Sequence, residues 1–190
     1  MPDGKERRLL ELAQGGDAQA YGSIVEFYDR RVYFAALGIL RNPDDAADLA
    51  QEAFVRAFRE LSKFDTSRPF YPWLYRLLRN LCLNHIRWRS RRREDSLDKL
   101  EESGHFLESD SDPSRAAELS DLRRQLELGM ARIQPKFREI LMLREFQEHS
   151  YEEIANLLEI PRGTVMSRLH HARRNLRAEL ESIRHGEAPR

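Results

Sequence analysis

Side chains that can bind nucleic acid are clustered near the C-terminal end of the sequence. Arginine can grip the edge of guanine with two hydrogen bonds, and the shorter hydroxyl groups bond to several bases. These residue types recur within residues 162–174 at steps that a helix would bring to one side. The candidate contacts to base edges or phosphates are Arg162, Thr164, Ser167, Arg168, His171 and Arg174.

The residues before this cluster have the pattern of a shorter helix and a tight turn. Ser150 and Glu153 have the spacing of a capping box, in which each side chain bonds to the backbone N–H of the other. Ile154, Ala155 and Leu158 are expected to face inward, as are Val165, Leu169, Ala172, Leu176 and Leu180 of the following helix. The pattern predicts a helix-turn-helix whose second helix enters the major groove. The alternative is an ordinary helical hairpin with a charged face.

A second segment, residues 70–89, combines aromatic, arginine and asparagine side chains. Arg76, Asn80, Asn84 and Arg87 follow one another at steps of four, four and three, so a helix would align them on one face. Aromatic rings can stack on unpaired bases while guanidinium groups follow the phosphates. The segment is therefore a candidate site for single-stranded nucleic acid, although Trp73 is expected to lie in the core.

The formal net charge of zero conceals three segments of opposite sign. Residues 65–93 hold eight arginines against one acid, and residues 161–177 hold five arginines and no acid. Residues 94–121 hold ten acids against two basic residues. Two basic surfaces separated by an acidic tether indicate two contacts with a polyanion. Two solvated helix faces are the alternative.

Several other classes of function are not supported. No nucleophile–base pair, phosphate-binding glycine loop or paired-carboxylate site is apparent, so no enzymatic activity and no cofactor are expected. Cys82 is the single cysteine and lies between two leucines, which favours burial over redox or metal chemistry. No apolar run is long enough to span a membrane, and the N-terminus lacks the pattern of a signal peptide. We expect a cytoplasmic protein that does not insert into membranes.

The elements that must position these side chains are predicted to be helices throughout. A first helix over residues 5–14 should stop at two glycines, and Asp17 should cap a long second helix. Asn42 and Pro43 should separate it from a third helix that ends near Leu61. Later helices are expected over residues 70–91 and 116–133, followed by a restart at residue 135 and two further helices ending near residue 183.

The predicted fold class is all-α, with two small helical domains. Residues 94–115 are acidic, rich in serine and aspartate and poor in large apolar side chains, so burial there cannot offset the entropy of ordering. We predict a domain over residues 1–93, a flexible acidic linker over residues 94–115, and a second domain over residues 116–190.

Three segments in order resemble the extracytoplasmic-function (ECF) sigma factors, which direct bacterial RNA polymerase to promoters. They are residues 45–58 (DAADLAQEAFVRAF), residues 70–89 and the helix-turn-helix. The resemblance covers residues 17–180, and the additional middle domains of larger sigma factors are absent. It implies that core RNA polymerase and promoter DNA are partners, duplex at the −35 element and single-stranded at the −10 element. An anti-sigma factor is a further expected partner.

The resemblance also implies roles for individual residues. Docking on the largest polymerase subunit is implied for Asp48, Gln51, Glu52, Phe54 and Arg56. Capture of the −10 strand, with a flipped base held by the loop over residues 64–71, is implied for Phe64, Ser67, Phe70, Tyr75, Arg76, Asn80, Asn84 and Arg87. Reading of the −35 element is implied for the helix-turn-helix face described above, with Arg144 and Tyr151 on neighbouring phosphates.

Three positions depart from the family pattern. Glu159 stands where glycine is common, so a left-handed backbone there would cost on the order of 1 kcal/mol. Met166 and His171 occupy positions that are often basic, which affects the promoter sequence more than the mode of binding. Two other functions remain open: a dimeric helix-turn-helix regulator that acts without polymerase, and a sigma mimic that only sequesters an inhibitor.

Overall fold

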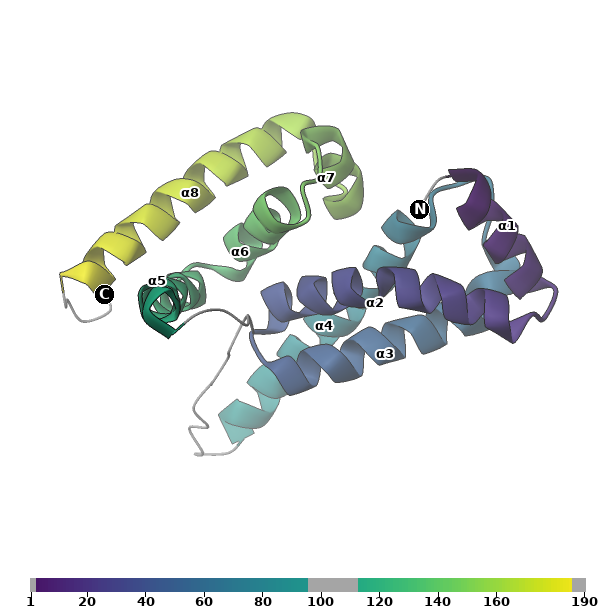
Figure 1. The fold of residues 1–190 in the computed structure, drawn as a ribbon, viewed down its shortest axis with the longest axis horizontal. Coiled ribbons are helices and arrows are strands. Elements are labelled where there is room, and N and C mark those ends of the chain that lie inside the picture. Colours follow the sequence, from purple (N-terminus) through teal and green to yellow (C-terminus); the bar gives the residue numbers. More distant parts are fainter. Residues whose placement is uncertain (1–2, 96–112, 186–190) are drawn as a thin grey trace. The chain divides into compact units, whose positions relative to one another are not determined.

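A computed structural model describes residues 3–95 and 113–185, and within these ranges the chain is helical and contains no strand (Figure 1). Two compact units follow one another, the first containing α1 to α4 and the second α5 to α8. This confirms the predicted all-α fold with two helical units. The elements are α1 (Asp3–Gln14), α2 (Ala18–Leu40), α3 (Pro43–Glu60), the 3-10 turn η1 (Leu61–Lys63), α4 (Phe70–Asp95), α5 (Pro113–Arg132), α6 (Pro135–Leu141), the π-helical turn η2 (Met142–Phe146), α7 (Tyr151–Leu158) and α8 (Arg162–Arg184).

The predicted linker lies mostly outside the described residues. At its edges α4 continues to Asp95 and α5 begins at Pro113, so both helices extend beyond their predicted limits. The exact borders of the domains and the flexibility of the linker stay predictions.

The helix starts and stops of the first unit follow the sequence signals. Gly16 has a φ of +96°, which ends α1 in a conformation that L side chains rarely adopt. The Oδ1 atom of Asp17 accepts hydrogen bonds from the backbone N–H groups of Gln19 and Ala20, at 2.9 and 3.0 Å, and caps α2. Arg41 turns the chain with a φ of 63°, and Pro43 opens α3. These predictions are confirmed.

The core of the first unit forms around α2, with α3 running beside it (Figure 1). Ile24 and Val32 of α2 are completely buried. The Tyr21 hydroxyl donates a hydrogen bond of 2.6 Å to the Phe54 carbonyl of α3, and burial raises the pKa of Tyr21, so it stays a donor. Tyr28 of α2 stacks on Tyr71 of α4 with ring centroids 5.6 Å apart. The N-terminal end of α4 is thereby packed on α2.

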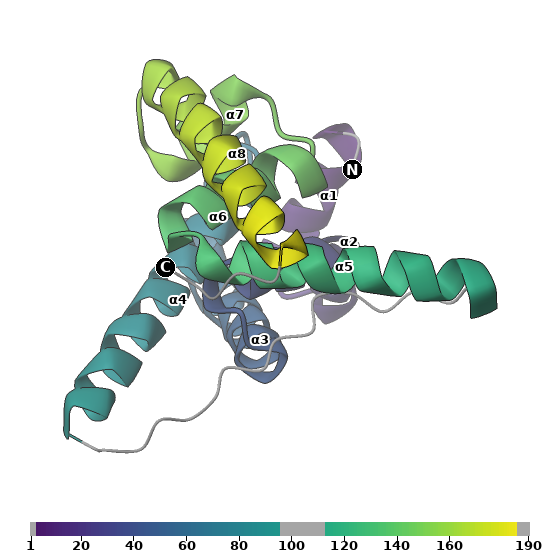
Figure 2. The same cartoon turned by 90° about the vertical axis from the view of Figure 1, so that its left-hand side faces the viewer.

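In the second unit α5, α6 and α7 all pack against α8. The C-terminal half of α8 lies against α5 (Figure 2), where Gly129 permits a close approach. A Cβ atom at Gly129 would lie 3.1 Å from side-chain carbons of both Leu176 and Leu180. The small residue therefore sets the distance between the two helices.

Candidate nucleic-acid and polymerase interfaces

The helix-turn-helix forms as the sequence predicts. Ser150 Oγ accepts a hydrogen bond from the Glu153 N–H at 3.2 Å, and Glu153 Oε2 accepts one from the Ser150 N–H at 2.7 Å. The capping box therefore fixes the first turn of α7. The predicted inward residues of α7 are buried, and so are Val165, Leu169 and Ala172 of α8. Leu176 and Leu180 are half-buried where α8 meets α5.

The turn between α7 and α8 contains a left-handed residue. Glu159 has φ 55° and ψ 45°, the conformation that a glycine would adopt at lower cost. Its backbone N–H donates to the Ala155 carbonyl, and the N–H of Ile160 donates to the same carbonyl at 3.0 Å. The fold therefore keeps the usual turn in spite of the glutamate.

The predicted DNA face of α8 is accessible. Arg162, Ser167, His171 and Arg174 are exposed, while Thr164 and Arg168 are half-buried along the edge of the face. The Ser167 hydroxyl donates to the Thr164 carbonyl at 3.1 Å, so its oxygen lone pairs remain available as acceptors. With Val165 and Leu169 fully buried, the helix is held with this face outward.

Arg144 and Tyr151, which precede the DNA face in the sequence, lie next to its first residue, Arg162. Arg144 stacks over the Tyr151 ring at 5.2 Å and donates to the His149 carbonyl at 2.8 Å. A pocket of about 350 Å³ is lined by Arg144, Ser150, Tyr151, Glu152 and Arg162. The two guanidinium groups and the two hydroxyl groups of this pocket suit a phosphate group, beside the one carboxylate, that of Glu152.

An ion pair that sequence reasoning missed braces α8. Arg173 donates two hydrogen bonds to Glu145 Oε1, at 3.1 and 2.7 Å, and this carboxylate raises the pKa of Arg173. The partners are 28 residues apart, so no local spacing reveals the pair.

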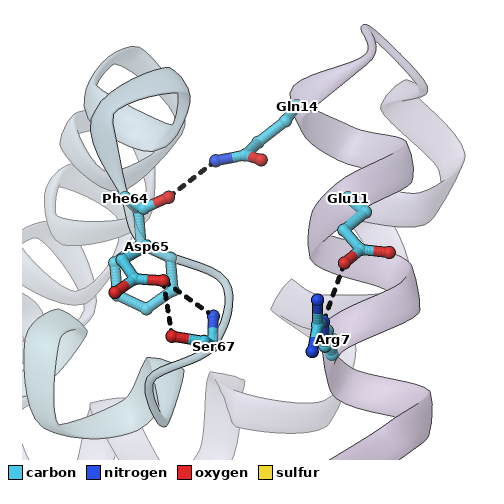
Figure 3. Close-up of polar contacts among 6 residues, drawn as sticks. All are labelled: Arg7, Glu11, Gln14, Phe64, Asp65 and Ser67. Carbon is cyan, nitrogen blue, oxygen red and sulfur yellow. Dashed lines mark hydrogen bonds and ion pairs between the residues drawn. The ribbon is translucent and has the colours of Figure 1, made fainter.

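In the first unit, the loop between η1 and α4 is held by its own aspartate. Asp65 Oδ1 accepts hydrogen bonds from the backbone N–H and the hydroxyl of Ser67, at 3.0 and 2.6 Å (Figure 3). These bonds, with the guanidinium of Arg68 3.3 Å away, lower the pKa of Asp65. The loop is therefore an ordered turn that exposes Ser67 and Arg68.

The aromatic side chains around this loop face inward. Phe64 is 9% exposed, and Phe70 and Tyr75 are buried almost completely. Phe64 and Phe70 contact each other and the half-buried ring of Trp73, with centroids 4.7 to 5.6 Å apart. In this conformation Phe64, Phe70 and Tyr75 support the loop from the core and present no face to a base, because packing has used their apolar surface. A direct contact of these rings with DNA stays a prediction.

The polar face of α4 is exposed as predicted. Arg76, Asn80, Asn84 and Arg87 all reach solvent, and Arg87 donates to Asn84 Oδ1 at 3.1 Å. Trp88 of the same helix is 52% exposed, and Arg92 is stacked over its ring at 4.7 Å. The end of α4 therefore adds an aromatic and cationic surface. In the sequence, only the arginines on either side of Trp88 indicate this surface.

Asp45 at the start of α3 ties this helix to α4. Its Oδ2 atom accepts a hydrogen bond of 2.7 Å from Arg89 and lies 3.3 Å from His85 Nε2. The carboxylate also lies in the first turn of α3, where it is favourable for the helix dipole. This contact orients the polar face of α4 relative to α3.

The predicted polymerase-docking residues of α3 divide into two groups. Asp48, Gln51 and Arg56 are exposed, and Glu52 accepts a hydrogen bond of 2.7 Å from Arg56. Phe54 is 5% exposed and is a core residue, because its turn of α3 packs on Tyr21. The apolar side chains that α3 exposes are Val55 and Phe58, which are 43% and 47% accessible.

Other kinds of site find little support in the part of the chain that the structure describes. Cys82 is fully buried, as predicted. No group of histidine, cysteine and acidic residues among residues 3–95 and 113–185 is arranged to hold a metal ion. Over the same residues, no helix is sufficiently long and apolar to cross a membrane.

Comparison with known families and proteins matches both units. Residues 24–92 match the family described as Sigma-70 region 2, and residues 123–176 match Sigma-70, region 4. The chain is 33% identical to the RNA polymerase sigma-H factor of Pseudomonas aeruginosa, covering 94% of this chain and 95% of the relative. It is 30% identical to the ECF RNA polymerase sigma factor SigW of Bacillus subtilis, covering 93% of this chain and 97% of the relative. It is 36% identical to the ECF RNA polymerase sigma-E factor of Escherichia coli, covering 87% of this chain and 88% of the relative.

Two solved structures share the fold. CnrH in complex with the cytosolic domain of CnrY gives a TM-score of 0.67 at 24% identity, covering 94% of this chain and 98% of that one. The sigma factor RpoE in complex with the anti-sigma factor NepR from Bartonella quintana gives a TM-score of 0.71 at 23% identity, covering 86% of this chain and 98% of that one. With two sigma-70 regions in order and near full-length relatives, the chain belongs to the ECF family of RNA polymerase sigma factors.

Proposed function

We propose that this sigma factor brings core RNA polymerase to its promoters through two separate contacts with DNA. The exposed face of α8 reads the −35 element as duplex, and the loop over residues 64–71 with the polar face of α4 holds the non-template strand of the −10 element. The observation that carries the proposal is that both faces are exposed while buried side chains fix the helices that present them. This arrangement suits binding in a fixed orientation.

The −35 contact combines base readout with phosphate positioning. Arg168, Thr164 and Ser167 offer donors and acceptors for base edges, and His171 and Arg174 extend the face along the groove. Arg144, Tyr151 and Arg162 surround the pocket at the start of α8, which supports a role as a phosphate clamp that sets the register of the helix.

The −10 contact is supported by the order of the loop and by the polar face that follows it. Ser67 at the loop and Arg76, Asn80, Asn84 and Arg87 on α4 offer hydrogen bonds to an extruded base and to the neighbouring backbone. The buried rings of Phe64, Phe70 and Tyr75 contribute by holding this surface in place from the core. The energy for strand separation then comes from binding and not from a chemical step, so we propose that the protein is not an enzyme.

Polymerase docking is assigned to α3. Asp48, Gln51 and Arg56 form its exposed polar surface together with the half-buried Glu52, and Phe54 supports that surface from the core. Residues 1–93 would then form the docking and melting domain, and residues 116–190 the −35 domain. Action on chromosomal promoters places the protein in the cytoplasm.

We further propose that an anti-sigma factor controls this protein. The similar protein RpoE has been solved with the anti-sigma factor NepR, and CnrH with the cytosolic domain of CnrY. An inhibitor of this kind would act by covering the surfaces that dock on polymerase or bind DNA.

The direct test is capture of purified core RNA polymerase by the tagged protein, followed by transcription from a promoter that the holoenzyme selects. The proposal requires both capture and initiation that core enzyme alone does not give. A dimer that binds duplex DNA without polymerase would indicate a conventional regulator. Capture of polymerase without any DNA binding would indicate a sigma mimic.

A further inference from the structure

Helix α1 lies outside the segment that matches sigma-70 region 2, because that match begins at residue 24. It packs on α2 and reaches the η1 turn at the start of the proposed strand-capturing loop. Figure 3 shows α1 facing this loop, with the side chains of Arg7 and Gln14 on the side of the helix nearest to it. The helix is therefore placed to act on the loop.

Gln14 holds the N-terminal end of the loop. Its Nε2 atom donates to the carbonyl of Phe64 at 2.8 Å, across 50 residues of sequence (Figure 3). The same atom donates to the carbonyl of Leu61, also at 2.8 Å, across 47 residues. The Leu61 carbonyl already accepts the Phe64 N–H of the η1 turn at 3.0 Å, and the amide of Gln14 is a second donor to the same oxygen, which has two lone pairs. One side chain of α1 thus bonds to the backbone of both the η1 turn and the loop.

Glu6 holds the C-terminal end of the same loop. Its side chain is buried, its Oε1 atom accepts a hydrogen bond from the Tyr28 hydroxyl, and its Oε2 atom lies 3.4 Å from the Phe70 N–H. Phe70 begins α4, where backbone N–H groups lack partners and a carboxylate is favourable. Burial and the bond to Glu6 raise the pKa of Tyr28, so the hydroxyl keeps its proton for this contact. Both ends of the loop are therefore anchored on α1.

Between α1 and the loop lies a pocket of about 310 Å³. It is lined by Gly4, Glu6, Arg7, Thr66, Ser67, Arg68 and Pro69. Arg7 pairs with Glu11 at 2.8 Å and Arg68 with Asp65 at 3.3 Å, but the arginine side chains are 61% and 78% exposed. Exposed ion pairs are weak, so either guanidinium can turn to a phosphate at little cost. The volume is at the small end of the range for ligand pockets and suits a single nucleotide unit.

We propose that α1 is the second wall of the site for the non-template strand, with Arg7 contacting a phosphate of the captured nucleotide and Gln14 and Glu6 acting as positioning residues for the loop. The pocket offers two guanidinium groups and two hydroxyl groups, which match a phosphate and a base edge, while the oxygens of the Glu6 carboxylate that also lines it are taken by Tyr28 and Phe70. The loop leads directly into the polar face of α4. This inference rests on the proposed function of the loop over residues 64–71.

The test uses holoenzyme reconstituted with full-length variants on a promoter that wild-type holoenzyme opens. Arg7→Ala is compared with Arg8→Ala, an exposed arginine next to it on α1 that does not line the pocket. We expect Arg7→Ala to lower permanganate reactivity of unpaired thymines by roughly three- to tenfold. It should also reduce the salt dependence of open-complex stability, with the log–log slope falling by about 0.7 for one phosphate on a single strand. Arg8→Ala should change neither quantity.

Gln14→Leu keeps the size of the side chain and removes the donor. We expect faster hydrogen exchange of the Phe64 and Arg68 amides and a reduced open fraction, with the affinity for core enzyme unchanged. Normal opening by both Arg7→Ala and Gln14→Leu would overturn the inference. If Asn80→Ala still impairs opening in that case, the proposed function stands and only the role of α1 is wrong. If no variant in the loop or on α4 affects opening, the proposed function fails as well.

Discussion

Arg168 lies at the edge of the DNA face of α8, one turn beyond Thr164, and is half-buried against the helix. Replacing it with alanine should weaken recognition of the −35 element by about 1 to 3 kcal/mol, because one good base contact is lost. Affinity for core enzyme should not change. Footprinting of the mutant holoenzyme measures the effect, and an unchanged footprint would show that α8 is oriented differently.

Arg177→Ala is the matched control for this substitution. Arg177 is exposed on α8 about two and a half turns further along, and so on the opposite side of the helix. It removes the same charge at a position that follows Arg174 by one turn and is not among the predicted DNA contacts. Loss of recognition in Arg168→Ala alone would separate base contact from a general electrostatic effect.

Glu159 allows a second prediction at the scale of one residue. Since it adopts φ 55°, Glu159→Gly should stabilise the folded protein by about 1 kcal/mol, by removing the steric cost of the left-handed conformation. Glu152→Gly, within α7, should destabilise it by about 1 kcal/mol, because glycine is a poor helix former. Chemical denaturation measures both variants. A loss of stability in Glu159→Gly would mean that contacts of the carboxylate outweigh the backbone strain.

For single residues, the sequence predicted correctly those contacts that join residues close together in the chain. The capping box of Ser150 and Glu153 and the cap at Asp17 depend on spacings of two or three residues, and both are confirmed. Phe54, Phe64, Phe70 and Tyr75 were predicted as contacts, but the structure buries them. Whether an aromatic ring faces a ligand or the core depends on which helices pack against it, and the sequence of one segment does not contain that information.

Helix α4 presents Asn80 and Arg87 on its exposed face. Asn80→Ala and Arg87→Ala should lower the open fraction of promoter complexes by roughly three- to tenfold, because each removes a hydrogen-bonding partner of the single strand. Closed-complex formation should be affected less. Permanganate footprinting reports opening and a gel-shift assay reports closed complexes. Normal opening with impaired closed complexes would mean that these residues bind duplex phosphates.

The helices themselves were largely predictable, because the apolar period, caps and glycine stops all act within a few residues. The π-helical turn over residues 142–146 was not predicted. In it the N–H of Gln147 donates to the Met142 carbonyl at 3.1 Å, one residue further back than in an α-helix. Neither proline nor glycine marks this turn in the sequence, and its residues Met142 and Leu143 are buried.

In the whole molecule, the segment that joins the two units is strongly acidic, and the effect of its negative charge on polymerase binding can be tested. Replacing Glu101, Glu102, Glu108, Asp110 and Asp112 with serine and glycine removes five charges and keeps the length; these positions lie outside the described residues. If the segment follows a basic channel of polymerase, affinity for core enzyme should fall at low salt. The difference should shrink at high salt, because screening acts over about 10 Å at 0.1 M. Equal affinities at every salt concentration would make the segment a spacer.

The division into two helical units was predictable from the charge pattern, since the basic segments form α4 and α8, in different units. The role of α1 was not predictable. Its contacts with the loop join residues that are 47 to 64 positions apart, and no short-range spacing encodes them. Long-range hydrogen bonds of this kind become visible only when the fold brings two elements together.

The most direct test of the central claim is to sequence the transcripts that purified core RNA polymerase makes on fragmented genomic DNA with and without this protein. We predict a defined set of new start sites, each preceded by shared −35 and −10 elements, and their loss when Arg168 and Asn80 are both replaced by alanine. A transcript population identical to that of core enzyme alone would contradict the assignment of this chain as a promoter-selecting subunit.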